Sequence, residues 1–194
     1  MKKTRQLTTM AVMTALSVCL VALIHFPIFP AVSFLEYDPA DIPILICGFA
    51  FGPAAGLAVT VIAAFVQGLT VSAQSGIYGI LMHIISTGAY VLSSGLFYKH
   101  HKTKKMAAVS IVIGTLTMTF VMFFANLVIT PYFMMGAVTK DTVSAVLSLM
   151  PYILLFNLVK AGANGIVTFF IYKRVRHFFS GEHTRPRTAG SAVK

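Results

Sequence analysis

The sequence predicts an all-α integral membrane protein with six transmembrane helices and both termini in the cytoplasm. Of its 194 residues, 57% are hydrophobic and only 10% are charged, whereas soluble domains contain about 25% charged residues. The apolar residues form runs that suit a bilayer span of about 20 residues. The basic residues gather on one side of the predicted bundle, which orients it.

Each predicted span is a mostly apolar run bounded by charged residues, proline or glycine. The first is too long for the apolar core of a signal peptide, so we expect it to be retained. Gly52 and Pro53 predict a tight turn between the second and third spans, and a longer connection is expected at 131–148. Residues 1–179 are predicted to form the membrane domain, and 180–194 a polar, disordered cytoplasmic tail. The six predicted spans are 6–26, 39–51, 54–71, 77–98, 106–130 and 150–172.

The positions of the basic residues predict the orientation of the bundle. Three precede the first span, four lie in the 99–105 loop and six follow residue 172, which together make 13 of the 15. The positive-inside rule places this side in the cytoplasm. Four of the five acidic residues are expected on the outer side, namely Glu36, Asp38, Asp41 and Asp141. We interpret the net charge of +10 as a topology signal with affinity for anionic lipid, and nucleic-acid binding as the weaker alternative.

Lys160 is the most informative residue for function. A lysine in the middle of a span costs roughly 2.5–3.5 kcal/mol to insert, and intramembrane charges usually mark functional sites. Asn157, Lys160 and Asn164 share one face of the sixth span. Three other spans each place one polar side chain at a depth similar to that of Asn157 and Lys160. These side chains are Gln67, His83 and Asn126. These side chains predict a pocket open to the outside.

The predicted pocket contains amides and one cation but no carboxylate within a span. This composition argues against a proton-coupled carrier, and the absence of metal-ligand or nucleophile–base motifs argues against catalytic or metal sites. Amides donate and accept hydrogen bonds, so the pocket suits a neutral, flat ligand with polar edges. Phe34 and Tyr37 lie near the mouth and can stack on a ring. For Gln67 alone and for His83 alone, hydrogen bonding between helices is the interpretation that we favour.

Two further patterns have structural interpretations. Asp38 is expected to cap the second helix, with Asp41 in its first turn. Ala11 and Ala15 form a small-x-x-x-small patch, which lets another helix approach closely. That helix is either part of the same bundle or part of another subunit.

Three further segments have a distinctive pattern: FLEYDPADIP at 34–43, GFAFGPAAG at 48–56 and NLVKAGAN at 157–164. They resemble the substrate-binding S components of energy-coupling factor (ECF) vitamin transporters, most closely the riboflavin-specific branch. The similarity extends to about residue 179.

The resemblance implies a six-helix protein in the cell membrane of a prokaryote, with riboflavin as its transported ligand and no cofactor. Asn126, Asn157 and Lys160 look like positions that contact the flavin ring, Gln67 matches as well, and the 27–37 loop would act as a lid. The third span departs from many relatives, with apolar or small residues where they are polar: Thr60, Ala63 and Ala64.

The resemblance also implies partners. Transport would need an energising module made of a transmembrane coupling protein and two ATPases, and this module would dock at Ala11 and Ala15. The alternatives are an S component for a different vitamin or vitamin precursor, and a stand-alone secondary carrier.

Overall fold

The computed structural model describes residues 2–180, which form six α-helices, two short 3₁₀ turns and one two-stranded hairpin. The predicted all-α fold with six helices is confirmed. Residues 181–194, where most of the predicted tail falls, lie outside the described part of the chain. The helices are α1 (Lys2–Leu23), α2 (Asp41–Phe51), α3 (Pro53–Leu69), α4 (Gly76–His100), α5 (Lys104–Met135) and α6 (Lys140–Ser180).

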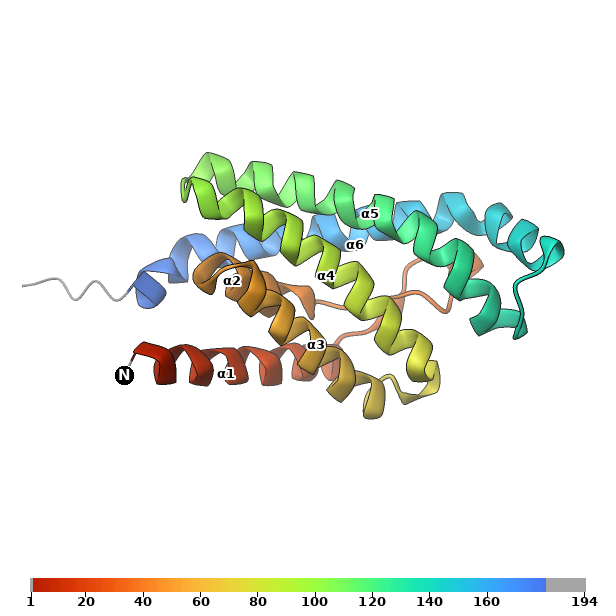
Figure 1. Ribbon diagram of the computed structural model, residues 1–194, viewed down its shortest axis with the longest axis horizontal. Coiled ribbons are helices and arrows are strands. Elements are labelled where there is room, and N and C mark those ends of the chain that lie inside the picture. Colours follow the sequence, from red (N-terminus) through yellow and green to blue (C-terminus); the bar gives the residue numbers. More distant parts are fainter. Residues whose placement is uncertain (1, 181–194) are drawn as a thin grey trace, which may run out of the picture.

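The six helices lie side by side along the long axis of the molecule (Figure 1). In the described residues, α1, α4, α5 and α6 are long and apolar enough to cross a membrane, while α2 and α3 are shorter. Large apolar side chains on the outer faces are more than half exposed, among them Leu116, Phe120, Ile166 and Phe170. Such an apolar exterior is expected where lipid, and not water, surrounds a bundle.

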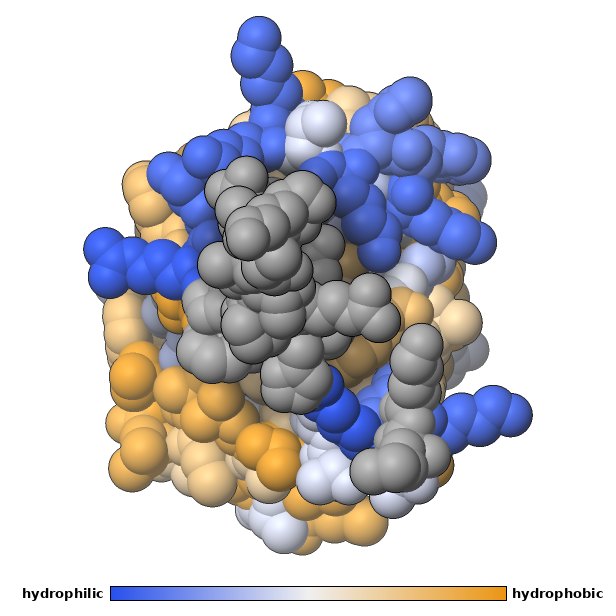
Figure 2. All heavy atoms as spheres, turned by 90° about the vertical axis from the view of Figure 1, so that its left-hand side faces the viewer, coloured by the Kyte–Doolittle hydropathy of each residue, from blue (hydrophilic) through white to orange (hydrophobic). Residues whose placement is uncertain are grey.

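The N-terminus, the connection from α4 to α5 and the last turn of α6 lie at one end of the bundle (Figure 1). Viewed from this end, the surface carries many hydrophilic side chains around its rim (Figure 2). The predicted partition of basic residues is therefore reproduced by the fold, because the N-terminus and the 99–105 segment share this end. We call it the basic end.

The helix α2 begins inside the bundle. It has 11 residues, which span only about 16 Å at 1.5 Å per residue, and it runs to the basic end before Gly52 turns the chain into α3 with a φ of 102°. A Cβ atom on Gly56 of α3 would collide with Val91 of α4, so glycine is required for this close approach. The start of α2 is consequently buried, and Asp41 has no exposed surface.

The segment between α1 and α2 covers the other end of the bundle. Its strands β1 (Phe26–Pro27) and β2 (Glu36–Tyr37) pair antiparallel. Between them lies the turn η1 (Pro30–Val32), whose Val32 is fully buried and clusters with Val146, Met150 and Ile153 of α6. The hairpin is thereby fixed to α6. Its role as a lid stays a prediction.

The predicted connection at 131–148 is wrong. The helix α5 continues through Pro131 to Met135, and only 136–139 separate it from α6. Pro131 is buried, and tertiary packing lets membrane helices accommodate a proline that would break an isolated helix. The break falls instead at Gly136, which has a φ of 73° and donates its N–H to the Tyr132 carbonyl.

Candidate ligand-binding site

A cavity of about 170 Å³ lies between the hairpin and the helices α1, α3, α4, α5 and α6. The hairpin side of the cavity is formed by Phe34, Leu35 and Glu36. Because the cavity lies toward the end opposite the basic end, its position agrees with the pocket that the sequence predicts. Four of the six predicted ligand-binding residues line it, namely Phe34, Gln67, Asn157 and Lys160.

Asn126 does not line the cavity, although it lies directly behind the wall. It is fully buried in α5, where its amide nitrogen donates to the Met122 carbonyl at 2.7 Å and its oxygen accepts from the Thr130 hydroxyl at 2.8 Å. Both Met122 and Thr130 line the cavity. In this structure Asn126 therefore positions wall residues and does not itself face the cavity.

Tyr37 is likewise outside the cavity wall. Its hydroxyl donates to the side-chain oxygen of Asn164 at 3.0 Å, so that it connects β2 to α6. The ring packs against Phe26 across the hairpin at 5.4 Å between centroids. The structure thus gives Tyr37 a role in holding the hairpin in place, whereas Phe34 faces the cavity.

The prediction of a pocket without a carboxylate is wrong. Asp38 lines the cavity, and its Oδ2 atom lies 2.6 Å from Nζ of Lys160, with only 12% and 11% of the two side chains exposed. Its Oδ1 atom accepts from the Ala40 N–H at 3.0 Å. The expected helix cap is wrong, because α2 begins at Asp41 with Ala40 as its N-cap and no side-chain cap hydrogen bond. Asp38 instead binds the N–H of Ala40 and neutralises the lysine. In low-dielectric surroundings, removal of either partner leaves the other charge buried and unpaired, which is strongly destabilising.

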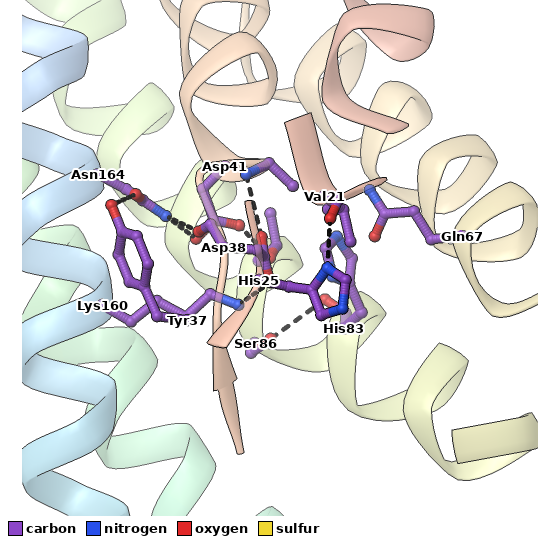
Figure 3. Close-up of polar contacts among 12 residues, drawn as sticks. Val21, His25, Tyr37, Asp38, Asp41, Gln67, His83, Ser86, Lys160 and Asn164 are labelled. Atoms are coloured by element: carbon purple, nitrogen blue, oxygen red, sulfur yellow. Dashed lines mark hydrogen bonds and ion pairs between the residues drawn. The ribbon is translucent and has the colours of Figure 1, made fainter. Parts of the chain in front are cut away.

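A second carboxylate lies deeper. The Asp41 side chain accepts from the Thr87 hydroxyl at 2.6 Å and from the Asn164 amide at 2.9 Å. The same amide nitrogen also donates to the Asp38 carbonyl at 2.9 Å. Figure 3 shows Lys160 and Asn164 directed from α6 toward these two acids. This network fixes the 38–41 segment against α4 and α6.

The sequence predicts Asp38 and Asp41 on the outer side, at the start of a short second span. In the structure both are buried, because α2 begins inside the bundle. The signal available in the sequence was the spacing of Lys160 and Asn164, one turn apart on α6. A buried lysine and a buried amide on one helical face require acceptors, and the two aspartates are the acceptors.

The cavity has an aromatic and thioether lining on one side. Phe34 and Phe133 have ring centroids 6.2 Å apart, and Tyr78 meets Phe133 edge-on at 6.0 Å. Met118, Met122 and Phe156 also line the cavity. Flat ligands stack on such surfaces, and methionine adapts to the shape of what it contacts.

The departures in the third helix affect the cavity little. The Thr60 hydroxyl donates to the carbonyl of Gly56 within α3 at 2.9 Å, and Ala63 is buried in the core. Only Ala64 lines the cavity. Gln67 lines it too and donates to the Ser17 hydroxyl at 3.3 Å, so the predicted hydrogen bonding between helices is present at that residue.

Ala11 and Ala15 are both exposed on the outer face of α1. Other side chains of α1 pack into the bundle, among them Met10, Met13 and Ser17. The alternative in which the two alanines pack inside the bundle is therefore wrong. The patch lies open on the surface of the described residues.

An apolar six-helix bundle with a polar, partly aromatic cavity toward one end is the architecture of a multi-pass membrane protein with space for a small ligand. Residues 5–172 match the family model described as "ECF transporter, substrate-specific component". The chain therefore belongs to the family of substrate-specific (S) components of ECF transporters. It is a transport protein and not an enzyme.

Two relatives and one solved structure illustrate this membership. The chain is 26% identical over 180 residues to the riboflavin transporter FmnP of Bacillus subtilis (strain 168), covering 90% of this chain and 93% of that protein. It is 26% identical over 180 residues to the riboflavin transporter RibU of Staphylococcus aureus (strain TCH60), covering 92% and 94%. A structure described as "Structure and mechanism of the S component of a bacterial ECF transporter" superposes with a TM-score of 0.77 at 22% identity, over 91% of this chain and 98% of that one.

The cavity-lining Asp38 removes the expected lack of a carboxylate, which disfavoured a proton-coupled carrier. Membership of the substrate-specific component family instead rests on the match over residues 5–172.

Proposed function

We propose that this protein binds riboflavin from the outside of the membrane and is the riboflavin-specific subunit of an ATP-driven ECF uptake system. The observation that carries the proposal is the set of side chains that line one cavity: Phe34, Asn157 and Lys160. The names of the relatives in Bacillus subtilis and Staphylococcus aureus support the same ligand.

The chemistry of this set suits a flavin ring. Asn157 donates one N–H to the Ile153 carbonyl at 2.8 Å, which leaves its second N–H and its carbonyl oxygen for a ligand. Lys160 has three N–H donors and uses one for Asp38. These groups can meet the carbonyl and imide edge of the ring, while Phe34 and its aromatic neighbours cover the apolar faces.

The ion pair also favours an uncharged ligand. Because Asp38 already balances the charge of Lys160, an anionic ligand would have to compete with a bound carboxylate. A neutral ring that accepts hydrogen bonds needs only the donors that the pair leaves unused.

The family implies an energising module as partner. We propose that it comprises a transmembrane coupling protein and two ATPases, and that it docks on the exposed patch of Ala11 and Ala15. Small residues on a lipid-facing surface permit the close approach of another helix.

The proposal is tested by an absorption spectrum of the detergent-purified protein, followed by titration of riboflavin fluorescence. A bound flavin absorbs visible light, and stacking in the cavity is expected to quench its emission. If the protein binds thiamine or pantothenate and leaves flavin fluorescence unchanged, the alternative of an S component for another vitamin replaces this one.

A further inference from the structure

A small crevice lies at the basic end, where the start of α5 meets the end of α4 and the C-terminal half of α6. Its volume is about 10 Å³, close to the smallest space that holds one water molecule. The polar side chains around it include Tyr98, Thr103, Lys104 and Lys173. None of its lining residues borders the ligand cavity, so the crevice is a separate feature of the molecule.

Tyr98 brings an unpaired hydroxyl group to this crevice. Its ring packs against Phe49 and Tyr172, with centroid distances of 4.7 and 5.7 Å, and only 3% of the residue is exposed. Within residues 2–180 its hydroxyl forms no hydrogen bond, whereas the Tyr172 hydroxyl donates to the Phe49 carbonyl at 3.2 Å. A buried tyrosine hydroxyl usually has a partner, so an acceptor atom that enters the crevice would supply the missing one.

The charge around the crevice is positive. Lys104 comes from the start of α5 and Lys173 from α6, and neither forms an ion pair with a carboxylate of the described residues. The four acidic residues in this part of the chain lie elsewhere, in or beside the hairpin, at the start of α2 and at the start of α6. Thr103 accepts from the Met106 N–H at 3.2 Å, which leaves its hydroxyl hydrogen free to donate. The crevice therefore offers several donors and two cations to an anion.

Exposed apolar side chains continue from both lysines along the bundle. On α6, Ile166, Phe170 and Lys173 share one helical face, and the first two are more than half exposed. On α5, Val112 lies about two turns from Lys104 and is also more than half exposed. Figure 2 shows hydrophilic side chains at this end beside hydrophobic flanks. A charged headgroup and its acyl chains would meet matching surfaces here.

We propose that this crevice binds the headgroup of an anionic phospholipid. One phosphate oxygen occupies the crevice and accepts from the Tyr98 hydroxyl, Lys104 and Lys173 balance the negative charge, and the acyl chains lie along α5 and α6. Because the crevice has room for about one oxygen atom, the rest of the headgroup stays at the surface. The inference does not depend on which vitamin the protein binds.

The test measures lipid binding to the detergent-purified protein by native mass spectrometry. Phosphatidylglycerol and phosphatidylcholine with the same acyl chains are added in equal amounts, and they differ in that choline balances the phosphate charge of the second. We expect the unaltered protein to bind phosphatidylglycerol at least about tenfold more tightly, because each lysine near the surface attracts an anionic headgroup. Equal binding of the two lipids overturns the proposal, and this comparison needs no variant.

Two double variants with the same charge locate the site. Lys104→Gln with Lys173→Gln should weaken phosphatidylglycerol binding by roughly tenfold or more. The matched control, Lys102→Gln with Lys105→Gln, removes two exposed charges from the same end that do not line the crevice. It should weaken binding by no more than about twofold, because such charges are screened by salt. Thermal unfolding without lipid checks that each variant is folded.

A single hydroxyl and a competing anion complete the test. Tyr98→Phe removes only the hydroxyl and should weaken phosphatidylglycerol binding by roughly threefold or more. Inorganic phosphate in large excess should leave the lipid bound, because it gains nothing from the apolar faces of α5 and α6.

Three results would overturn the proposal. Equal losses in the two double variants would show a diffuse attraction to the basic end. Unchanged binding in Tyr98→Phe would show that no lipid oxygen reaches its hydroxyl. Displacement of phosphatidylglycerol by inorganic phosphate would identify the crevice as a site for a free anion and not for lipid.

Discussion

Asp38 Oδ2 lies 2.6 Å from Lys160 Nζ, so that the segment before α2 is joined to α6 across 122 positions of sequence. The pair borders the cavity and is almost completely buried. A ligand that bonds to Lys160 would contact a group whose position is set by Asp38. We therefore expect stability and ligand binding to be coupled at this contact.

The first prediction tests that coupling. Lys160→Ala leaves the Asp38 carboxylate unpaired, and the loss of one partner of a buried pair costs roughly 3–5 kcal/mol. Lys160→Met combined with Asp38→Asn removes both charges and should recover most of the stability. Thermal unfolding in detergent measures the difference. Equal melting temperatures for Lys160→Ala and for the double variant would show that the unpaired Asp38 carboxylate does not destabilise the protein.

The second prediction separates cavity contacts from supporting contacts. Asn157→Ala removes a cavity-lining amide and should weaken riboflavin binding by about tenfold, or roughly 1.4 kcal/mol. Lys160→Met with Asp38→Asn should weaken it at least as much, because two charge-assisted groups are lost. Fluorescence titration measures both affinities.

Asn126→Ala serves as the comparison for Asn157→Ala. Because Asn126 bonds to Met122 and Thr130 and does not line the cavity, we expect a smaller loss of affinity than for Asn157→Ala. A loss at Asn126 equal to or larger than that at Asn157 would mean that the Asn126 amide turns into the cavity when ligand binds.

The third prediction concerns orientation. The basic end should face the cytoplasm, so an impermeant thiol reagent added outside should label a cysteine introduced at 140 and miss one at 102. The measurement requires a background without Cys19 and Cys47, since Cys19 is exposed. The reverse labelling pattern would place the cavity on the cytoplasmic side and contradict uptake from outside.

The fourth prediction separates binding from energisation. Ala11→Leu with Ala15→Leu should keep riboflavin affinity unchanged, because both side chains are exposed on α1. The added bulk should abolish copurification with the ATPase module and ATP-driven uptake. The matched control is Ala108→Leu on the exposed surface of α5, which should leave both intact. Retained copurification in the α1 variant would place the docking surface elsewhere.

Most of the fold could be predicted because its signals are local. The helices α1, α3 and α4 follow apolar runs bounded by charges, glycine or proline, and the predicted ends differ from the observed ones by only a few residues. The junction of α5 and α6 could not be predicted in this way. Pro131 carries a local breaking signal that packing within the bundle overrides.

The site was predicted where polar residues occur within an apolar run. Asn157, Lys160 and Gln67 were identified for that reason, and Phe34 from its place near the mouth, and all four line the cavity. Asp38 and Asp41 were not identified as site residues, because a carboxylate beside a loop looks exposed until the depth of the loop is known. That depth depends on the length of α2 and on its contacts with α3, α4 and α6, which are tertiary properties.

The buried start of α2 has an electrostatic consequence for the whole cavity. A helix carries a partial positive charge at its N-terminus, equivalent to about half an elementary charge. Because α2 begins inside the bundle, this partial charge lies where water cannot screen it, and Asp41 occupies the first turn that faces it. The macrodipole thus provides part of the favourable potential that keeps a second carboxylate buried. The short helix supplies a fixed source of positive potential beside a binding cavity without an additional basic side chain.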